Sequence, residues 1–158
     1  MEIEKKYLVF RLPDGWEDCP FHEIEQAYLC RKPVIRVRKK DDRYILTVKG
    51  KGKMAREEFE LPLEEEAYRR LLSKAEGVII RKKRVLVPLF PYRVELDFFQ
   101  EPFGDLIMAE VEFPTMEEAL AFTPPDWFGE EVTEDPRFHN ARMSAGEYPE
   151  HSFWKVSG

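Results

Sequence analysis

In seven short segments of this sequence, alternate positions separate a set that carries charge from a set that is mainly apolar. In the first segment Glu2, Glu4 and Lys6 occupy alternate positions, and successive side chains of an extended strand point to opposite faces. The charges of each segment therefore share one face. The other six segments are 34–39, 44–49, 56–61, 78–87, 93–98 and 109–113. The pattern predicts seven strands, each with one charged face.

The charges on these faces are balanced in number and sorted by segment. Arg36 and Arg38 stand together in one segment, and Glu110 and Glu112 stand together in another. Because a sheet face open to water normally mixes the two signs, the sorting favours a site for an anionic ligand that carries metal. The set contains eight acids and eight bases: Glu2, Glu4, Glu58, Glu60, Glu95, Asp97, Glu110 and Glu112, with Lys6, Arg36, Arg38, Lys49, Arg56, Lys82, Arg84 and Arg93. The bases Lys39, Lys40, Arg81 and Lys83 are predicted to lie on the outer face.

Three further segments are predicted to be helical. Pro62 precedes an apolar stripe at helical spacing over 63–75. Thr115 begins a short helix with a capping box, and another short helix is expected within 136–145. Apolar helix faces pack on apolar strand faces, so the charged faces must point away from the helices. The sequence predicts an α+β protein, mainly antiparallel β, whose sheet closes into a barrel with a charged lumen and helices packed outside.

The composition describes one soluble domain. The 158 residues include 25 Lys and Arg against 31 Asp and Glu, a net charge of −6. Such a chain is not expected to grip nucleic acid or an anionic membrane. No apolar run approaches the roughly 18 residues that span a bilayer, and Cys19 and Cys30 lack the partners of a zinc site. We expect a cytoplasmic protein without nucleic-acid or membrane partners.

The N-terminal Glu2-x-Glu4-x-Lys6 resembles the ExExK signature of the CYTH superfamily, the triphosphate tunnel metalloenzymes. Further matches follow in order: 26–29 (QAYL), 34–38 (VIRVR), 46–50 (LTVKG), 56–58 (REE), 80–84 (IRKKR), 95–99 (ELDFF), 109–113 (AEVEF) and 131–133 (EVT). Val85 departs from the Tyr that the family often has, and the end of the chain matches nothing recognised. We expect the CYTH domain to span 1–145, followed by a C-terminal tail at 146–158.

The resemblance implies an eight-stranded antiparallel tunnel that binds a triphosphate with divalent metal. Alternation identifies seven strands, so the eighth is expected to be a short or split segment. The superfamily includes inorganic triphosphatases, thiamine triphosphatases, RNA triphosphatases and class IV adenylate cyclases. The resemblance therefore leaves the substrate open.

The chemistry of the side chains divides the charged set into roles. Arg and Lys suit phosphate oxygens, so the expected substrate-binding residues are Lys6, Arg36, Arg38, Lys49, Arg56, Lys82 and Arg84. Carboxylates approach a phosphate favourably only through a cation, so the expected ligands of Mg²⁺ or Mn²⁺ are Glu2, Glu4, Glu110 and Glu112. These four with Lys6 form the expected catalytic set, in which a metal-activated water attacks the terminal phosphorus. The roles of Glu58, Glu60, Glu95 and Asp97 stay open between catalysis and pairing with Arg.

Three functions are compatible with such a site. The favoured one is metal-dependent hydrolysis of the terminal phosphate of inorganic tripolyphosphate, with nucleoside or thiamine triphosphates as further candidates. The second is a class IV-type adenylate cyclase, although no segment can be assigned to adenine. The third is a non-catalytic polyphosphate-binding module, against which both ExE pairs count, because binding a polyanion alone needs bases. The sequence is also compatible with a homodimer.

Overall fold

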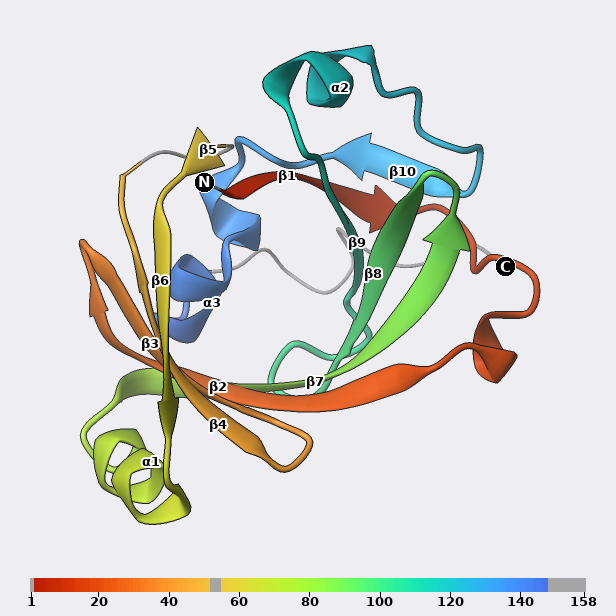
Figure 1. The fold of residues 1–158 in the computed structure, drawn as a ribbon. Helices are drawn as coiled ribbons and strands as arrows, with labels where there is room; N and C mark the ends of the chain where they lie inside the picture. Colours follow the sequence, from red (N-terminus) through yellow and green to blue (C-terminus); the bar gives the residue numbers. More distant parts are fainter. Residues whose placement is uncertain (1, 52–54, 148–158) are drawn as a thin grey trace.

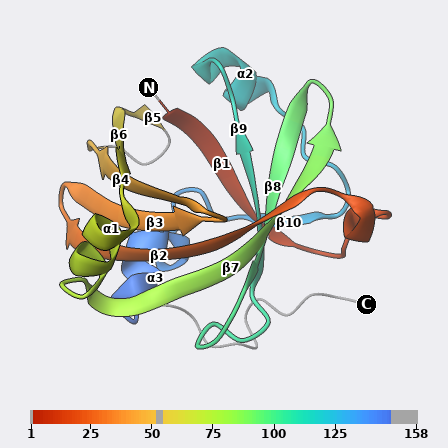
Figure 2. The same cartoon turned by 60° about the horizontal axis from the view of Figure 1, so that its bottom comes forward.

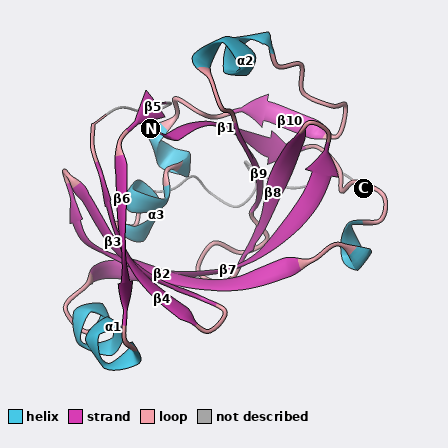
Figure 3. Ribbon diagram, in the orientation of Figure 1, coloured by secondary structure: helices cyan, strands magenta, loops and turns pink. Residues whose placement is uncertain are grey.

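One antiparallel sheet dominates the computed structural model, which describes residues 2–51 and 55–147 (Figure 1). Within these residues the strands are β1 (Glu2–Val9), β2 (Phe21–Arg31), β3 (Val34–Lys40), β4 (Arg43–Lys49), β5 (Ala55–Arg56), β6 (Glu58–Leu63), β7 (Glu76–Leu89), β8 (Tyr92–Phe99), β9 (Ile107–Glu112) and β10 (Phe128–Glu131). The helices are α1 (Glu65–Leu72), α2 (Met116–Ala121) and α3 (Asn140–Ser144), with 3-10 turns at Trp16–Asp18 and Pro136–Phe138 (Figure 3). The predicted α+β class and the antiparallel sheet are confirmed.

All seven alternating segments lie in strands. The eighth strand is expected to be short or split: β10, with four residues, is short, whereas β2 has 11 residues. Alternation did not reveal it because Gln26, Ala27 and Tyr28 are all buried, so its centre has no charged face. The sequence also missed β10, and the segment 56–61 divides at Glu57 into β5 and β6.

The prediction of a closed eight-stranded barrel is not confirmed. The sheet of the described residues has ten strands, and its hydrogen-bonded order, β10-β1-β9-β8-β7-β2-β3-β4-β6, has two ends. β5 lies off this order and pairs with β1, where Glu2 is opposite Arg56 and Ile3 is opposite Ala55. The strands nevertheless curve strongly around a shared interior, as two views of the ribbon show (Figures 1 and 2).

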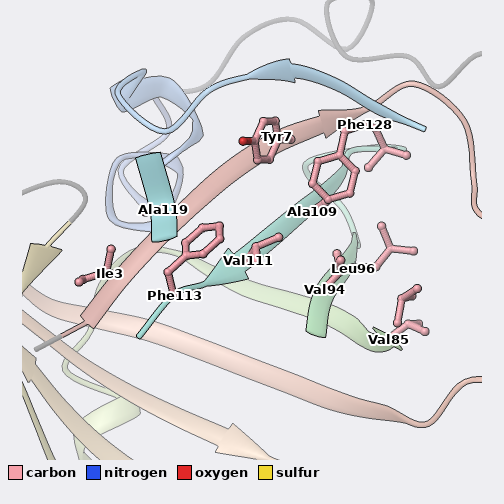
Figure 4. Close-up of a cluster of buried hydrophobic side chains, with 12 residues drawn as sticks. Ile3, Tyr7, Val85, Val94, Leu96, Ala109, Val111, Phe113, Ala119 and Phe128 are labelled. Carbon is pink, nitrogen blue, oxygen red and sulfur yellow. The ribbon is translucent and has the colours of Figure 1, made fainter. Parts of the chain in front are cut away.

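The apolar sides of β1, β7, β8 and β9 form the largest buried cluster (Figure 4). Ile3 and Tyr7 of β1 pack there with Val94 and Val111. Phe113, which follows β9, and Ala119 of α2 extend the cluster. The residues between Ile3 and Tyr7 include Glu4, which the period of two turns to the opposite side of the strand. Hydrophobic burial on one side thus fixes the register that places charge on the other.

Two of the predicted helices pack outside the sheet, and the third does not. Helix α1 lies on β3 and β4, where Tyr68 is fully buried, although it begins at Glu65 because Pro62 belongs to β6. Helix α2 contacts β1 and begins as predicted, since Thr115 Oγ1 accepts a hydrogen bond from the Glu118 amide at 3.1 Å. Helix α3 instead packs against β7 and β2 and lines the interior cavity described below. The expectation that every helix lies outside is therefore wrong for α3.

The last described residues follow α3 directly, ending at Glu147. The predicted tail, 146–158, lies outside the described residues from position 148 onward, and its boundary stays a prediction. Within residues 2–51 and 55–147, no helix has the length and apolarity needed to cross a membrane.

Candidate active site

A cavity of about 1160 Å³ lies inside the curved sheet. Fifteen of the sixteen charged residues singled out by alternation line it, contributed by β1, β3, β4, β5, β6, β7, β8 and β9. The exception is Asp97, which is 1% exposed and contacts the lining residues Lys82 and Arg84. The structure therefore brings together all the side chains predicted to bind substrate or metal: Glu2, Glu4, Lys6, Arg36, Arg38, Lys49, Arg56, Lys82, Arg84, Glu110 and Glu112.

The cavity also contains residues that the sequence did not single out. Lys40 lines it, so its predicted outer position is wrong. The signal was present, because Lys40 shares the parity of Arg36 and Arg38 along β3. Alternation of charge does not mark the further polar lining residues at the end of β2, in connections and in α3, which include Arg31, Lys32, Lys51, His139, Asn140 and Arg142.

Asp97 neutralises two of the buried bases. Its carboxylate accepts two hydrogen bonds from the Arg84 guanidinium at 2.8 and 2.9 Å, and it lies 2.8 Å from Lys82 Nζ. Burial alone raises the pKa of Asp97, but Arg84 and Lys82 outweigh it and lower that pKa. Lys82 shares this carboxylate with Arg84, so burial and repulsion from Arg84 prevail and lower the pKa of Lys82 to about 8, against the attraction of Asp97.

Glu110 is likewise held by bases. It pairs across β1 and β9 with Lys6, the Oε1 to Nζ distance being 3.5 Å, and its Oε2 lies 3.7 Å from Arg84. Burial opposes ionisation of Glu110, but Lys6 and Arg84 outweigh it and lower its pKa below the usual range. Glu110 is thus a compensated carboxylate.

Glu4 and Glu112 face each other directly across β1 and β9. Burial raises the pKa of Glu4, and repulsion from Glu110 adds to it. Burial also raises the pKa of Glu112, with repulsion from Glu2 and Glu95 adding to it. Like charges opposite each other on a sheet are destabilising, so this pair is suited to a cation.

The four predicted metal ligands therefore differ in their surroundings. Glu2 lies 2.8 Å from Lys49 Nζ and 3.9 Å from Arg56 Nε, so it resembles Glu110 in being paired with bases. Within the part of the chain that the structure describes, no three His, Cys, Asp or Glu side chains form a metal-binding group. Mg²⁺ commonly takes one or two carboxylates and completes its shell with water and substrate phosphates. The Glu4 and Glu112 pair fits that pattern.

Arg36, Arg38 and Lys40 form the opposite case on β3. Among the described residues no carboxylate forms an ion pair with any of the three, and Arg36 Nε is buried without a hydrogen-bond partner. Burial, together with repulsion from Arg36 and Arg84, lowers the pKa of Arg38 to about 9. Buried charge without a partner is costly, so this side of the cavity is suited to an anion.

The site combines a carboxylate pair for a cation with bases for a polyanion, inside a wall of antiparallel strands. That combination is what the CYTH resemblance predicts for a site that takes a polyphosphate with a divalent metal. No family model matches the chain. It is 35% identical to an inorganic triphosphatase of Nitrosomonas europaea over 147 residues, which is 90% of this chain and 96% of the relative. An inorganic triphosphatase of Acetivibrio thermocellus is 33% identical over 153 residues, 93% and 95% of the two chains.

Solved structures agree with these relatives. The crystal structure of an inorganic triphosphatase has a TM-score of 0.70 and 33% identity, covering 94% of this chain and 97% of that one. A conserved protein of Pyrococcus furiosus, at 20% identity and a TM-score of 0.60, covers 77% and 85% of the two chains and shows the fold alone. The chain belongs to the inorganic triphosphatase family within the CYTH superfamily.

Proposed function

We propose that this protein hydrolyses inorganic tripolyphosphate at its terminal phosphate with the help of Mg²⁺ or Mn²⁺. The observation that carries the proposal is the set of cavity-lining bases Arg36, Arg38 and Lys40, which have no carboxylate partners among the described residues, in a cavity that Glu4 and Glu112 also line. An anion with several phosphates satisfies the bases, and a cation satisfies the carboxylates. The two relatives named inorganic triphosphatase support the reaction.

The bases bind and orient the phosphate chain. Arg36 and Arg38 offer forked donors to phosphate oxygens, and Lys40 adds a point charge beside them. Lys6 and Arg84, held by Glu110 and Asp97, present charge from fixed positions. We assign the predicted remaining binders Lys49, Arg56 and Lys82 to the same chain of phosphates.

The metal is assigned to Glu4 and Glu112, with the predicted Glu2 and Glu110 adjoining them. When bound, it neutralises phosphate charge and lowers the pKa of a water molecule. Glu2 pairs with Lys49 and Glu110 pairs with Lys6, so two of the predicted metal ligands are joined by ion pairs to two of the predicted phosphate binders. The proposed catalytic set consists of these four carboxylates and Lys6. It uses no Ser, Cys or His nucleophile.

One assay tests this proposal. Purified protein is incubated with Mg²⁺ or Mn²⁺ and each of tripolyphosphate, pyrophosphate, ATP and thiamine triphosphate, while orthophosphate and cyclic AMP are measured. We expect orthophosphate mainly from tripolyphosphate, little from pyrophosphate, no cyclic AMP, and no activity in excess chelator. Cyclic AMP without orthophosphate would establish a cyclase. Tight binding of tripolyphosphate without turnover would establish a binding module. Full activity in excess chelator would contradict the role of the metal.

We also propose that the wall closes into a barrel through Glu57, which alone separates β5 on β1 from β6 on β4. The Gly50 amide donates to the Glu57 carbonyl at 2.9 Å, so the ladder from β4 reaches this residue. Hydrogen exchange measures the closure directly. Slow exchange at 2–3 and 55–56 is expected, and exchange at the rate of an open loop contradicts it.

The predicted cytoplasmic location and the homodimer stay predictions. Both Cys19 and Cys30 are free thiols, which supports a reducing compartment. Size-exclusion chromatography with light scattering measures the oligomeric state.

A further inference from the structure

Two buried amides connect the phosphate-binding bases to α3. Gln26 of β2 is fully buried, and Asn140 at the start of α3 is 7% exposed. Arg38 Nε donates to Gln26 Oε1 at 2.8 Å, Gln26 Nε2 donates to Asn140 Oδ1 at 2.8 Å, and Lys82 Nζ donates to the same oxygen at 3.0 Å. The chain of hydrogen bonds thus runs from one base to another through both amides.

The direction of this chain is fixed by its two ends. Arg and Lys side chains carry donors only, so an amide oxygen must face each of them. The Asn140 oxygen therefore faces Lys82, and the Gln26 oxygen faces Arg38, which leaves the Gln26 amino group to donate to Asn140. A reversal of either amide would set two donors against each other.

Helix α3 is also anchored by contacts that do not involve these amides. Arg31 donates from Nε to the Ala141 carbonyl at 3.0 Å and from its guanidinium to Ser144 Oγ at 3.2 Å. Met143 is fully buried in a separate apolar cluster. The helix therefore has contacts with the sheet that would remain if the hydrogen bonds of Gln26 and Asn140 were lost.

Arg38 has a particular need for such a partner. It has no carboxylate within ion-pair distance among the described residues, and Arg36 and Arg84 repel it. A neutral acceptor can orient its guanidinium without cancelling its charge, whereas a carboxylate in the place of Gln26 would compete with phosphate. Lys82 differs in having the Asp97 carboxylate at 2.8 Å, and the Asn140 oxygen at 3.0 Å gives its amine a second, neutral acceptor that fixes its direction.

We propose that Gln26 and Asn140 are positioning residues that aim Arg38 and Lys82 at the phosphate chain, so that α3 forms part of the substrate site. This inference rests on the proposed function. It predicts that the amides act on substrate binding through the bases they hold. Their loss should weaken tripolyphosphate binding with little change in the rest of the fold.

A double-mutant cycle tests the proposal. The dissociation constant of tripolyphosphate is measured by calorimetry for wild type, Gln26→Met, Arg38→Ala and the double variant. Gln26→Met should weaken binding by about tenfold, the scale of one hydrogen bond to a charged group. In the Arg38→Ala background the same change should weaken binding by less than about twofold, because residues that act through one another are not additive.

Asn140→Ala and Met143→Ala complete the design. Asn140→Ala is paired with Lys82→Ala, because Asn140 contacts Lys82 directly; it should weaken binding less in that background, and it serves as the second variant if Gln26→Met does not fold. Met143→Ala loosens α3 without touching the amides, so it should lower the melting temperature and change binding by an equal factor in both backgrounds. Equal factors for the amide variants in the two backgrounds, or no effect, would overturn the positioning role. A wild type that neither binds nor hydrolyses tripolyphosphate would instead remove the proposed function and this inference with it.

Discussion

The neutralised bases Lys82 and Arg84 and the unneutralised bases Arg36 and Arg38 share one cavity but meet opposite surroundings. The first two converge on Asp97 at 2.8 Å each, within a wall that is almost fully buried. The second two have no carboxylate partner in the described parts of the chain, and one nitrogen of Arg36 has no partner of any kind. A compensated charge serves the fold, whereas an uncompensated one is stabilised when a ligand of opposite charge binds. The comparison therefore separates bases whose charge is already balanced within the wall from bases whose charge is left for the substrate to balance.

The largest expected effect comes from breaking the compensated set. Asp97→Asn keeps the shape but leaves Lys82 and Arg84 buried without their carboxylate, so unfolding should require about 3–5 kcal/mol less free energy. Urea denaturation followed by circular dichroism measures the change. Glu95→Gln is the matched control, since Glu95 pairs with Arg84 through Nη1 at the longer distance of 3.2 Å and its side chain is 24% exposed. Equal stability of Asp97→Asn and wild type would contradict a structural role for Asp97.

Arg38→Ala should show the reverse behaviour. Loss of a forked donor to phosphate is expected to lower kcat/KM for tripolyphosphate about 100-fold, or roughly 2.7 kcal/mol. Stability should stay within about 0.5 kcal/mol or rise, because repulsion from Arg36 and Arg84 is relieved. Phosphate release and urea denaturation are measured on the same preparation. A variant that unfolds as readily as Asp97→Asn would erase the distinction between the two sets.

Glu4→Gln tests the carboxylate wall. The change removes charge with little change of shape and should weaken Mg²⁺ or Mn²⁺ support of turnover by at least about tenfold. It should also raise stability slightly, since Glu4 and Glu112 repel each other. Metal titrations of the rate measure the first effect. An unchanged metal requirement would contradict the assignment of the metal to Glu4 and Glu112.

A smaller effect is expected from pH. Burial and Arg84 lower the pKa of Lys82 to about 8, so the amine is charged below that pH and neutral above it. The affinity for tripolyphosphate should therefore fall up to about tenfold between pH 7 and 9. Lys82→Met, which cannot titrate, provides the control for the ionisation of tripolyphosphate itself. Parallel curves for the two proteins would argue against titration of Lys82.

The smallest effects test which side chains of β3 face the cavity and which face outward. Lys39→Ala, on the outer face, should alter kcat/KM less than about twofold, and so should Lys83→Ala. Lys40→Ala, one residue away and lining the cavity, should lower it severalfold. The steady-state rates of these three variants measure the contrast. A larger effect at Lys39 than at Lys40 would contradict the assignment of Lys40 to the cavity face of β3.

Much of the site could be predicted because a strand's period is short and local. Once Glu4 and Lys6 are assigned to one face, Ile3 and Tyr7 must lie on the other, and the same holds for each charged strand. The period fails where both faces are buried, as at Gln26 to Tyr28, because no alternation of polarity is left to observe. It also gives no information on short helices at a cavity end, which is why Asn140 was not found.

The sequence by itself determined which face of each alternating strand carries charge, and so identified fifteen of the side chains that line the cavity. Only the tertiary structure decided which charges are compensated, because the pairings join strands far apart in the chain. Lys6 meets Glu110 and Lys49 meets Glu2 through register and sheet curvature that no local pattern encodes. Coulombic energy depends on the distance and burial of a particular pair, so the same sixteen charges become either structural pairs or ligand-binding groups according to how the strands are brought together.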